Sequence, residues 1–350
     1  MTWPGGVAAL LAMVLAAAGC ADEPTAPYPA STHVRVTAWA PTSAIGRFAV
    51  ESDNWPMTWG DDDALYTSYG DGWGFVPRID TKLSLGLARI DAGPDPVRGV
   101  NVRAPTAERK GDGPAGGKAS GMLMVDGTLY MLVRNLRNCR LAWSGDRGRT
   151  WTWGHRFTES FGTATFLNFG RNYAGAPNDH ADWVYVYSSD GPSTYVSYDR
   201  ILLARAPRGT IRDAATWEFF TGRTAEGAAR WSSAIGERQG VFEDKGRCCR
   251  LDAVYHAPSG RYLLVVGADM NGGWGIYDAP HPWGPWTTVY YTASWGLGAT
   301  HSYRLPSKWM ASSGESAYLV FSGRPYRGTD YDALCVRRMT LQTPKRTTKR

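Results

Sequence analysis

The sequence has no long amphipathic helical pattern, and only 20% of its residues are charged. It also lacks a phosphate-binding loop, a dinucleotide fingerprint, an HExxH motif and a GxSxG motif. Phosphoryl-transfer, redox and serine-hydrolase chemistry therefore have no support in the sequence. The chain is instead rich in aromatic residues and glycine, with 16 Trp, 18 Tyr and 41 Gly. Aromatic residues favour strands and Gly favours tight turns, so this composition predicts an all-β protein.

Cysteine is scarce, and no pair has the CxxC spacing that is typical of a zinc site. Four thiols remain after Cys20, at Cys139, Cys248, Cys249 and Cys335. The leader described next implies export, which permits disulfides, so we expect a structural bridge among these four rather than a metal site. No metal and no cofactor are expected.

The first 20 residues are predicted to be an export signal. The segment from Gly6 to Cys20 is apolar and rich in small residues, and it is shorter than a membrane-spanning helix. Cys20 follows Ala-Ala-Gly, as in a bacterial lipobox, although Ala17 stands where Leu is usual. We therefore expect an exported lipoprotein that is anchored to a membrane through Cys20, with plain secretion as the alternative.

Both flanks of the main domain are predicted to be flexible. Residues 21–32 contain three Pro and are interpreted as a tether. Residues 344–350 carry four positive charges in KRTTKR, which we interpret as a solvated tail rather than a nucleic-acid site. Residues 33–343 are left for one folded domain, which we expect to be a monomer.

A strand–turn–strand pattern ending in an Asp, Asn or Gly cluster recurs five times at intervals of roughly 50 to 80 residues. Radial repetition of such units predicts a five-bladed β-propeller with four-stranded antiparallel blades around a central pocket. Blade five lacks a fourth strand, and we expect His33–Ala40 to supply it and close the ring. The copies are Asn54–Gly72, Gly121–Asn135, Asp182–Gly191, Leu251–Asp269 and Ser302–Arg324.

One motif tests this alignment of strands. Residues Ser144–Trp151 match the Asp-box pattern SxDxGxTW of sialidases and related propellers. The motif falls on the turn between the third and fourth strands of blade two, away from the expected pocket. We therefore predict that Asp146 is structural and accepts backbone N–H groups of its turn.

Strand direction separates the remaining acidic residues into two groups. Turns between the first and second strands of each blade lie at the end of the axis away from the pocket, so the acids on them are interpreted as turn chemistry. These acids are Asp61, Asp62, Asp63, Asp126, Asp179 and Asp182. Asp53 precedes the first strand of blade one and Asp71 follows the second. Adjacent strands are about 4.8 Å apart, so these two carboxylates should come together at the pocket.

The predicted pocket suits a sugar. Aromatic faces stack on sugar C–H surfaces, while a carboxylate pair supplies the acid and the base or nucleophile of glycoside hydrolysis. Asp53 and Asp71 are the predicted catalytic pair. The predicted substrate-binding residues are Trp55, Trp73, Arg134, Asn135, Asp190, Arg250, Asp252, Asp269, Trp274, His301 and Arg324, with Trp295 beside them.

Several longer motifs resemble a bacterial family of five-bladed propellers that was first described as a domain of unknown function. They are Ser52–Phe75, Ile201–Gly222, Gly260–Val266, Ala279–Tyr291 and Leu305–Gly323. Some members of that family are glycoside hydrolases that act on D-arabinan. The resemblance implies that this chain is such a hydrolase, with Asp53 and Asp71 at the positions of the acidic pair. The Asp box and Arg247–Arg250 are not features of that family, so its specificity need not transfer.

Three other functions fit parts of the sequence. A non-catalytic carbohydrate-binding propeller would use the same aromatic residues without turnover. A sialidase would need an arginine triad, for which Arg134, Arg250 and Arg324 lie at the expected end of the propeller. A protein-interaction scaffold is also compatible with the fold, but the polar and acidic pocket argues against it.

Overall fold

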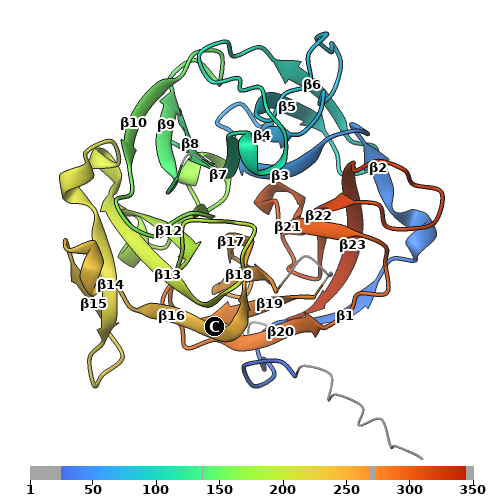
Figure 1. Cartoon of the computed structure of the whole chain (residues 1–350). Helices are drawn as coiled ribbons and strands as arrows, with labels where there is room; N and C mark the ends of the chain where they lie inside the picture. The colour runs from blue at the N-terminus through green and yellow to red at the C-terminus, as the bar shows by residue number, and fades with distance from the viewer. Residues whose placement is uncertain (1–24, 136, 269–272, 344–350) are drawn as a thin grey trace, which may run out of the picture.

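The computed structural model describes residues 25–135, 137–268 and 273–343, and shows antiparallel sheets arranged around a central axis (Figure 1). Cys20 and the export signal, Asp269 and the basic tail lie outside the described residues. Blades one and two have the expected four strands each. They comprise β3 (Asp53–Trp59), β4 (Leu65–Gly70), β5 (Gly86–Ala92), β6 (Arg98–Val102), β7 (Lys118–Val125), β8 (Thr128–Arg134), β9 (Arg140–Ser144) and β10 (Thr152–Arg156).

Blades three and four form one 10-stranded sheet because their inner strands pair in parallel. Blade five contains three consecutive strands and two N-terminal ones. The strands of blades three and four are β11 (Thr165–Asn168), β12 (Trp183–Ser189), β13 (Tyr198–Pro207), β14 (Glu218–Arg223), β15 (Ala229–Ser232), β16 (Gly240–Cys248), β17 (Leu251–His256), β18 (Arg261–Gly267), β19 (Trp274–Ala279) and β20 (Thr287–Thr292). Blade five holds β21 (Thr300–Arg304), β22 (Ser316–Gly323), β23 (Leu334–Gln342), β1 (Arg35–Trp39) and β2 (Gly46–Phe48).

The five inner strands form a closed ring. Contacts run from β3 to β7, β7 to β11, β11 to β17, β17 to β21 and β21 back to β3. The ring is closed in sequence as well, because β1 pairs antiparallel with β23. The predicted five-bladed propeller and its closure by the N-terminal strand are therefore confirmed.

Burial falls from the axis outward, which explains the sequence patterns. Every residue of the inner strand β7 is buried, whereas no residue of the outer strand β10 is. Strands that are covered on both faces are nearly continuous apolar runs, while outer strands tolerate polar residues. Asp126 and Gly127 join β7 to β8 with φ values of 50° and 70°, as a two-residue type I′ hairpin requires.

Blade three departs from the predicted four strands. Strand β13 has 10 residues, and its two halves pair with different partners. Ala204 and Arg205 pair with β14, whereas Tyr198 to Leu202 pair with β16. Strand β15 then adds a further strand outside β14. The sequence between residues 223 and 250 therefore extends this blade.

The expected disulfide is not formed, because all four described thiols are free and buried. Each has its own polar contact within the fold. The thiol of Cys139 contacts Ser120 Oγ, that of Cys249 donates to the carbonyl of Thr194, and that of Cys335 donates to the carbonyl of Gly323. The vicinal Cys248 donates to the carbonyl of Asp244. None of the described helices is both long and apolar enough to cross a membrane.

Candidate active site

The inner strands all begin at the same end of the axis, which we call the entry end. The first residues of β3 and β7, and the residues that follow β4 and β8, meet there. Four further segments contribute, namely the start of β21 and the segments that precede β13, β17 and β23. The entry end is defined here by Asp53, Asp71, Lys118, Arg134, Asn135, Tyr195, Arg250, His301 and Asp332.

Asp53 and Asp71 lie at the paired ends of β3 and β4, as strand direction predicts. Asp53 is the register partner of Gly70, and Asp71 is the next residue along the chain. A β-bulge between Asn54 and Met57 interrupts β3 directly after Asp53. Bulges next to functional sites commonly redirect side chains. The Oδ1 atom of Asp53 is buried and has no hydrogen-bond donor within the described part of the chain.

The carboxylate of Asp71 is held by two donors. Lys118 forms an ion pair with Oδ1, and the backbone N–H of Gly113 donates to Oδ2 at 3.0 Å. Burial raises the pKa of Asp71 and the negative charge of Asp53 raises it further, while the hydrogen bond from Lys118 opposes both. The net direction is upward, so Asp71 holds its proton to a higher pH than an ordinary Asp.

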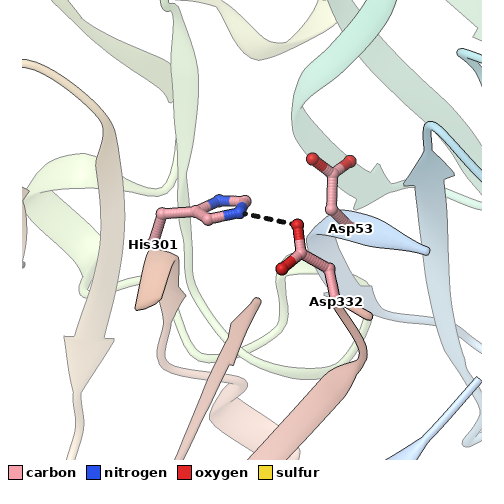
Figure 2. A group of neighbouring side chains, drawn as sticks. All are labelled: Asp53, His301 and Asp332. Carbon is pink, nitrogen blue, oxygen red and sulfur yellow. Dashed lines mark hydrogen bonds and ion pairs between the residues drawn. The ribbon is translucent and has the colours of Figure 1, made fainter. Parts of the chain in front are cut away.

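His301 connects two charged groups at the entry end. Arg250 donates to its Nδ1 at 2.7 Å, and its Nε2 lies 3.3 Å from Oδ2 of Asp332 (Figure 2). A guanidinium can only donate, so Nδ1 accepts and the imidazole carries its hydrogen on Nε2. Burial alone would raise the pKa of Asp332, but the hydrogen bond from His301 and the nearby positive charges lower it.

Among the described residues, one group at the entry end could hold a metal ion. Asp53, His301 and Asp332 each offer a ligand atom, and these atoms lie within 4.8 Å of one another. Figure 2 shows the three side chains close together, with His301 bonded to Asp332 and Asp53 beside them. However, a histidine binds a metal through a lone pair, and Nε2 carries the hydrogen that is donated to Asp332. The donor set therefore fits a hydrogen-bonded cluster better than a cation site.

Two arginines flank one tyrosine on the other side of the entry end. The guanidinium carbons of Arg134 and Arg250 lie 5.5 and 5.9 Å from the ring centre of Tyr195. Arg134 also donates to the Tyr195 hydroxyl at 3.4 Å and to the side chain of Asn135 at 3.1 Å. Arg134 is buried, with 3% of its surface exposed.

Asp252 lies deeper along the axis than predicted. Its Oδ1 is 3.7 Å from Arg304, and its Oδ2 accepts the backbone N–H of Leu305 at 2.8 Å. Burial raises the pKa of Asp252 to about 6, although the charge of Arg304 opposes the shift. Both side chains are buried. Asp252 therefore belongs to the interior of the ring and not to the entry end.

Asp190 and Arg324 also differ from the predicted arrangement. Asp190 forms ion pairs with Arg200 at 2.6 Å and with Arg238 at 3.1 Å, which commits its carboxylate to bonds within blade three. Arg324 is half exposed and lies 3.9 Å from Asp332.

The predicted ring of tryptophans is largely wrong. Trp55 and Trp274 have no exposed surface, so neither can stack on a substrate. Trp55 packs on Tyr69 and Phe75, and Trp274 stacks on Tyr303 with 4.5 Å between ring centres. Their indoles fill the space between blades.

The other two predicted tryptophans retain some exposed surface. Trp295 packs against Trp39 and Phe321, so it also contributes to the contact between blades. Trp73 is partly exposed and follows Asp71 closely in the chain. It is therefore the better placed of the two for contact with a ligand.

The acids that were assigned to turns lie away from the entry end. Arg147 of the Asp-box turn pairs with Asp61 at 3.4 Å, and Asp126 pairs with Arg208. Asp146 accepts the N–H groups of Arg149 and Thr150 at 3.1 and 2.9 Å, as predicted. Burial alone would raise the pKa of Asp146, but these hydrogen bonds lower it to about 2. These carboxylates join turns and blades.

Sequence reasoning did not identify Lys118, Tyr195 or Asp332. Lys118 begins the inner strand of blade two, but the predicted strand started three residues later, at Gly121. Asp332 lies between β22 and β23, and the direction of these strands places their connection at the entry end. Tyr195 lies in the equivalent connection of blade three. Strand direction alone could have placed both residues at the entry end, because it determines which connections lie there. Nothing in their local sequence identifies them as site residues.

The sequence matches no protein-family model, and no curated protein sequence matches it. The fold is similar to solved propeller enzymes at low identity. A GH43_1 enzyme from Xanthomonas citri is 13% identical with a TM-score of 0.51, over 85% of this chain and 90% of that one. The RS223 β-xylosidase is 12% identical with a TM-score of 0.51, over 86% and 95%. At these identities the likeness establishes the fold alone.

Proposed function

We propose that this protein is a glycoside hydrolase in which Asp53 and Asp71 act on the glycosidic bond of a polysaccharide. The observation that carries the proposal is the pairing of these carboxylates at the entry end. One has a buried oxygen with no donor among the described residues, and the pKa of the other is raised. Two carboxyl groups in different environments are what acid–base cleavage of a glycoside requires.

The two environments suggest the roles. Asp71, which keeps its proton to higher pH, is the general acid that protonates the leaving oxygen. Lys118 then stabilises the carboxylate that remains. Asp53, whose Oδ1 has no donor in the described structure, is the base or nucleophile on the other side of the bond.

Support for the substrate class comes from two sources. The sequence motifs resemble a family with members that degrade D-arabinan, so we propose D-arabinan or a related furanoside as the first polymer to test. The Xanthomonas citri enzyme of similar fold has also been solved with xylotriose, at a TM-score of 0.50 and 13% identity. Xylan therefore belongs in the same panel.

The test is reducing-sugar release by the purified protein from D-arabinan, L-arabinan, xylan and a pectic polysaccharide. Release from one polymer that disappears in Asp53→Asn would support the proposal. Binding to a polymer without release, unchanged in Asp53→Asn and Asp71→Asn, would overturn it in favour of the non-catalytic carbohydrate-binding propeller.

We also propose export and lipid anchoring, on the basis of the apolar segment Gly6–Cys20. Cell fractionation tests this directly. The full chain should sediment with membranes and the Cys20→Ala variant should not, whereas membrane association that survives the substitution would contradict lipidation at this residue.

A further inference from the structure

Arg134 and Arg250 carry two positive charges at the entry end with no ion-pair partner among the described residues. The ion pairs of that end join Lys118 to Asp71 and Arg324 to Asp332, the neutral His301 donates a hydrogen bond to Asp332, and none of these contacts includes either guanidinium. The hydrogen bonds of Arg134 go to Asn135 and Tyr195, and those of Arg250 go to His301 and Ser302.

These two guanidiniums are close enough to affect each other. Both lie within 6 Å of the ring centre of Tyr195, on which they converge from blades two and four. Burial lowers the pKa of Arg250, and the positive charge of Arg134 lowers it further. Two like charges in a partly desolvated place repel each other, so an anion placed near both is strongly favoured.

The carboxylates and the two guanidiniums without an ion pair lie on different blades of the entry end. Asp53, Asp71 and Asp332 belong to blades one and five, whereas Arg134 and Arg250 belong to blades two and four. The hydroxyl oxygen of Tyr195 accepts from Arg134 and Asn135, each at 3.4 Å, which leaves its hydrogen available to a ligand. A planar guanidinium can bind carboxylate or phosphate oxygens in bidentate fashion.

From this arrangement we infer that the entry end binds a sugar unit with an anionic group, whose acid oxygens contact Arg134, Arg250 and Tyr195. The inference names the substrate class of the proposed hydrolase and rests on that function. A uronate carboxylate and a sugar phosphate share the required chemistry. In either case the sugar ring lies between the arginines and the carboxylate pair.

The first test compares ligands that differ only in charge. Isothermal titration of the wild-type protein would use methyl glucuronide, its methyl ester, which removes the charge, and glucose 6-phosphate beside glucose. At least tenfold tighter binding of one anion than of its neutral counterpart, weakened by added salt, supports the inference. Equal affinity within each pair overturns it.

The second test assigns the residues. Arg134→Gln and Arg250→Gln should each remove the preference for the anion, while Arg134→Lys and Arg250→Lys, which keep a charge, should retain part of it. Arg212→Gln is the matched control, because Arg212 also lies over aromatic rings but is exposed and bonds to Thr128 at the opposite end. Melting temperatures of all variants identify any that fail to fold.

Failure of the inference and failure of the proposed function give different results. If the protein hydrolyses a neutral polysaccharide and both Gln variants do so at the same rate, the proposed hydrolase function stands and the anionic subsite is overturned. A preference for the anion without hydrolysis of any polymer would support the subsite and overturn the hydrolase.

Discussion

Arg250 donates a 2.7 Å hydrogen bond to Nδ1 of His301, and this bond determines what the imidazole offers to its other neighbours. Because Nδ1 accepts, Nε2 carries the hydrogen and donates it to Asp332. His301 therefore connects a half-buried cation of blade four to a carboxylate of blade five. It acts here as a positioning residue.

This arrangement predicts that activity does not depend on a metal held by His301. Dialysis against EDTA should leave the rate of hydrolysis unchanged, and added Ca²⁺ or Zn²⁺ should not raise the melting temperature. The group of Asp53, His301 and Asp332 makes this a real test, because its ligand atoms are close enough to bind an ion. Metal-induced stabilisation that disappears in His301→Asn would show that the tautomer argument is wrong.

Lys118→Met is predicted to shift the pH profile. In the wild type, Lys118 lowers the pKa of Asp71, which burial and Asp53 raise. Removing the ammonium should raise this pKa further, so the alkaline limb of kcat/KM should move to higher pH. The sign follows because a general acid is active only while it is protonated.

The control for that experiment is Lys308→Met, since Lys308 pairs with Asp63, a turn residue away from the entry end, at 3.1 Å. Its substitution should leave the limb in place. An alkaline limb that does not move in Lys118→Met would remove Asp71 from the role of acid.

Gly70→Ala is predicted to reduce turnover far more than stability. A Cβ atom at this position would lie 2.6 Å from Oδ1 of Asp53, so the carboxylate must move. We expect at least a tenfold loss in kcat, because small displacements of reacting groups reduce rates strongly. Gly145→Ala is the matched control, as a Cβ there meets no atom within 4 Å. Equal kcat values in the two variants would contradict the assigned position of Asp53.

Because Asp252 is buried, we predict that it makes the free energy of unfolding depend on pH. Its pKa is raised to about 6, whereas an unfolded Asp titrates near about 3.9. The folded state therefore retains a proton that the unfolded state has lost, and stability from this group falls as pH rises from about 4 through about 6.

Asp252→Asn removes this titration. Relative to the variant, the wild type should lose roughly 1 to 3 kcal/mol of unfolding free energy between pH 4 and pH 7. Urea denaturation at both pH values measures the difference. A gap that grows in favour of the wild type at pH 7 would mean that Arg304 dominates and that the pKa is lowered.

The sequence predicts the blades well because strand–turn–strand units are local, and their direction determines which loops share an end. That rule placed Asp53 and Asp71 together and assigned Asp126 and Asp146 to turns. It could not predict which aromatic residues face the axis. Inner strands are covered on both faces, so the alternation in β3 does not show that Trp55 packs in a cluster with residues of blade five.

Contacts between residues far apart in the chain could not be predicted from the sequence for a related reason. Asp332 reaches the entry end from a connection of 10 residues, between Gly323 and Leu334, and its position depends on packing rather than on register. The thiols could not be paired from spacing, because each one is buried with its own partner. The convergence of Arg134 and Arg250 on Tyr195 likewise involves three different blades.

The most direct test of the central claim is turnover by Asp53→Asn and Asp71→Asn on the polysaccharide that the wild type cleaves, with Asp126→Asn as the acidic control from the opposite end. We predict that the first two variants fold, keep their melting temperatures within a few degrees and lose at least 1,000-fold in kcat/KM, on the order of 4 kcal/mol of transition-state stabilisation. The control should retain wild-type activity. Turnover that persists in both entry-end variants would contradict the account.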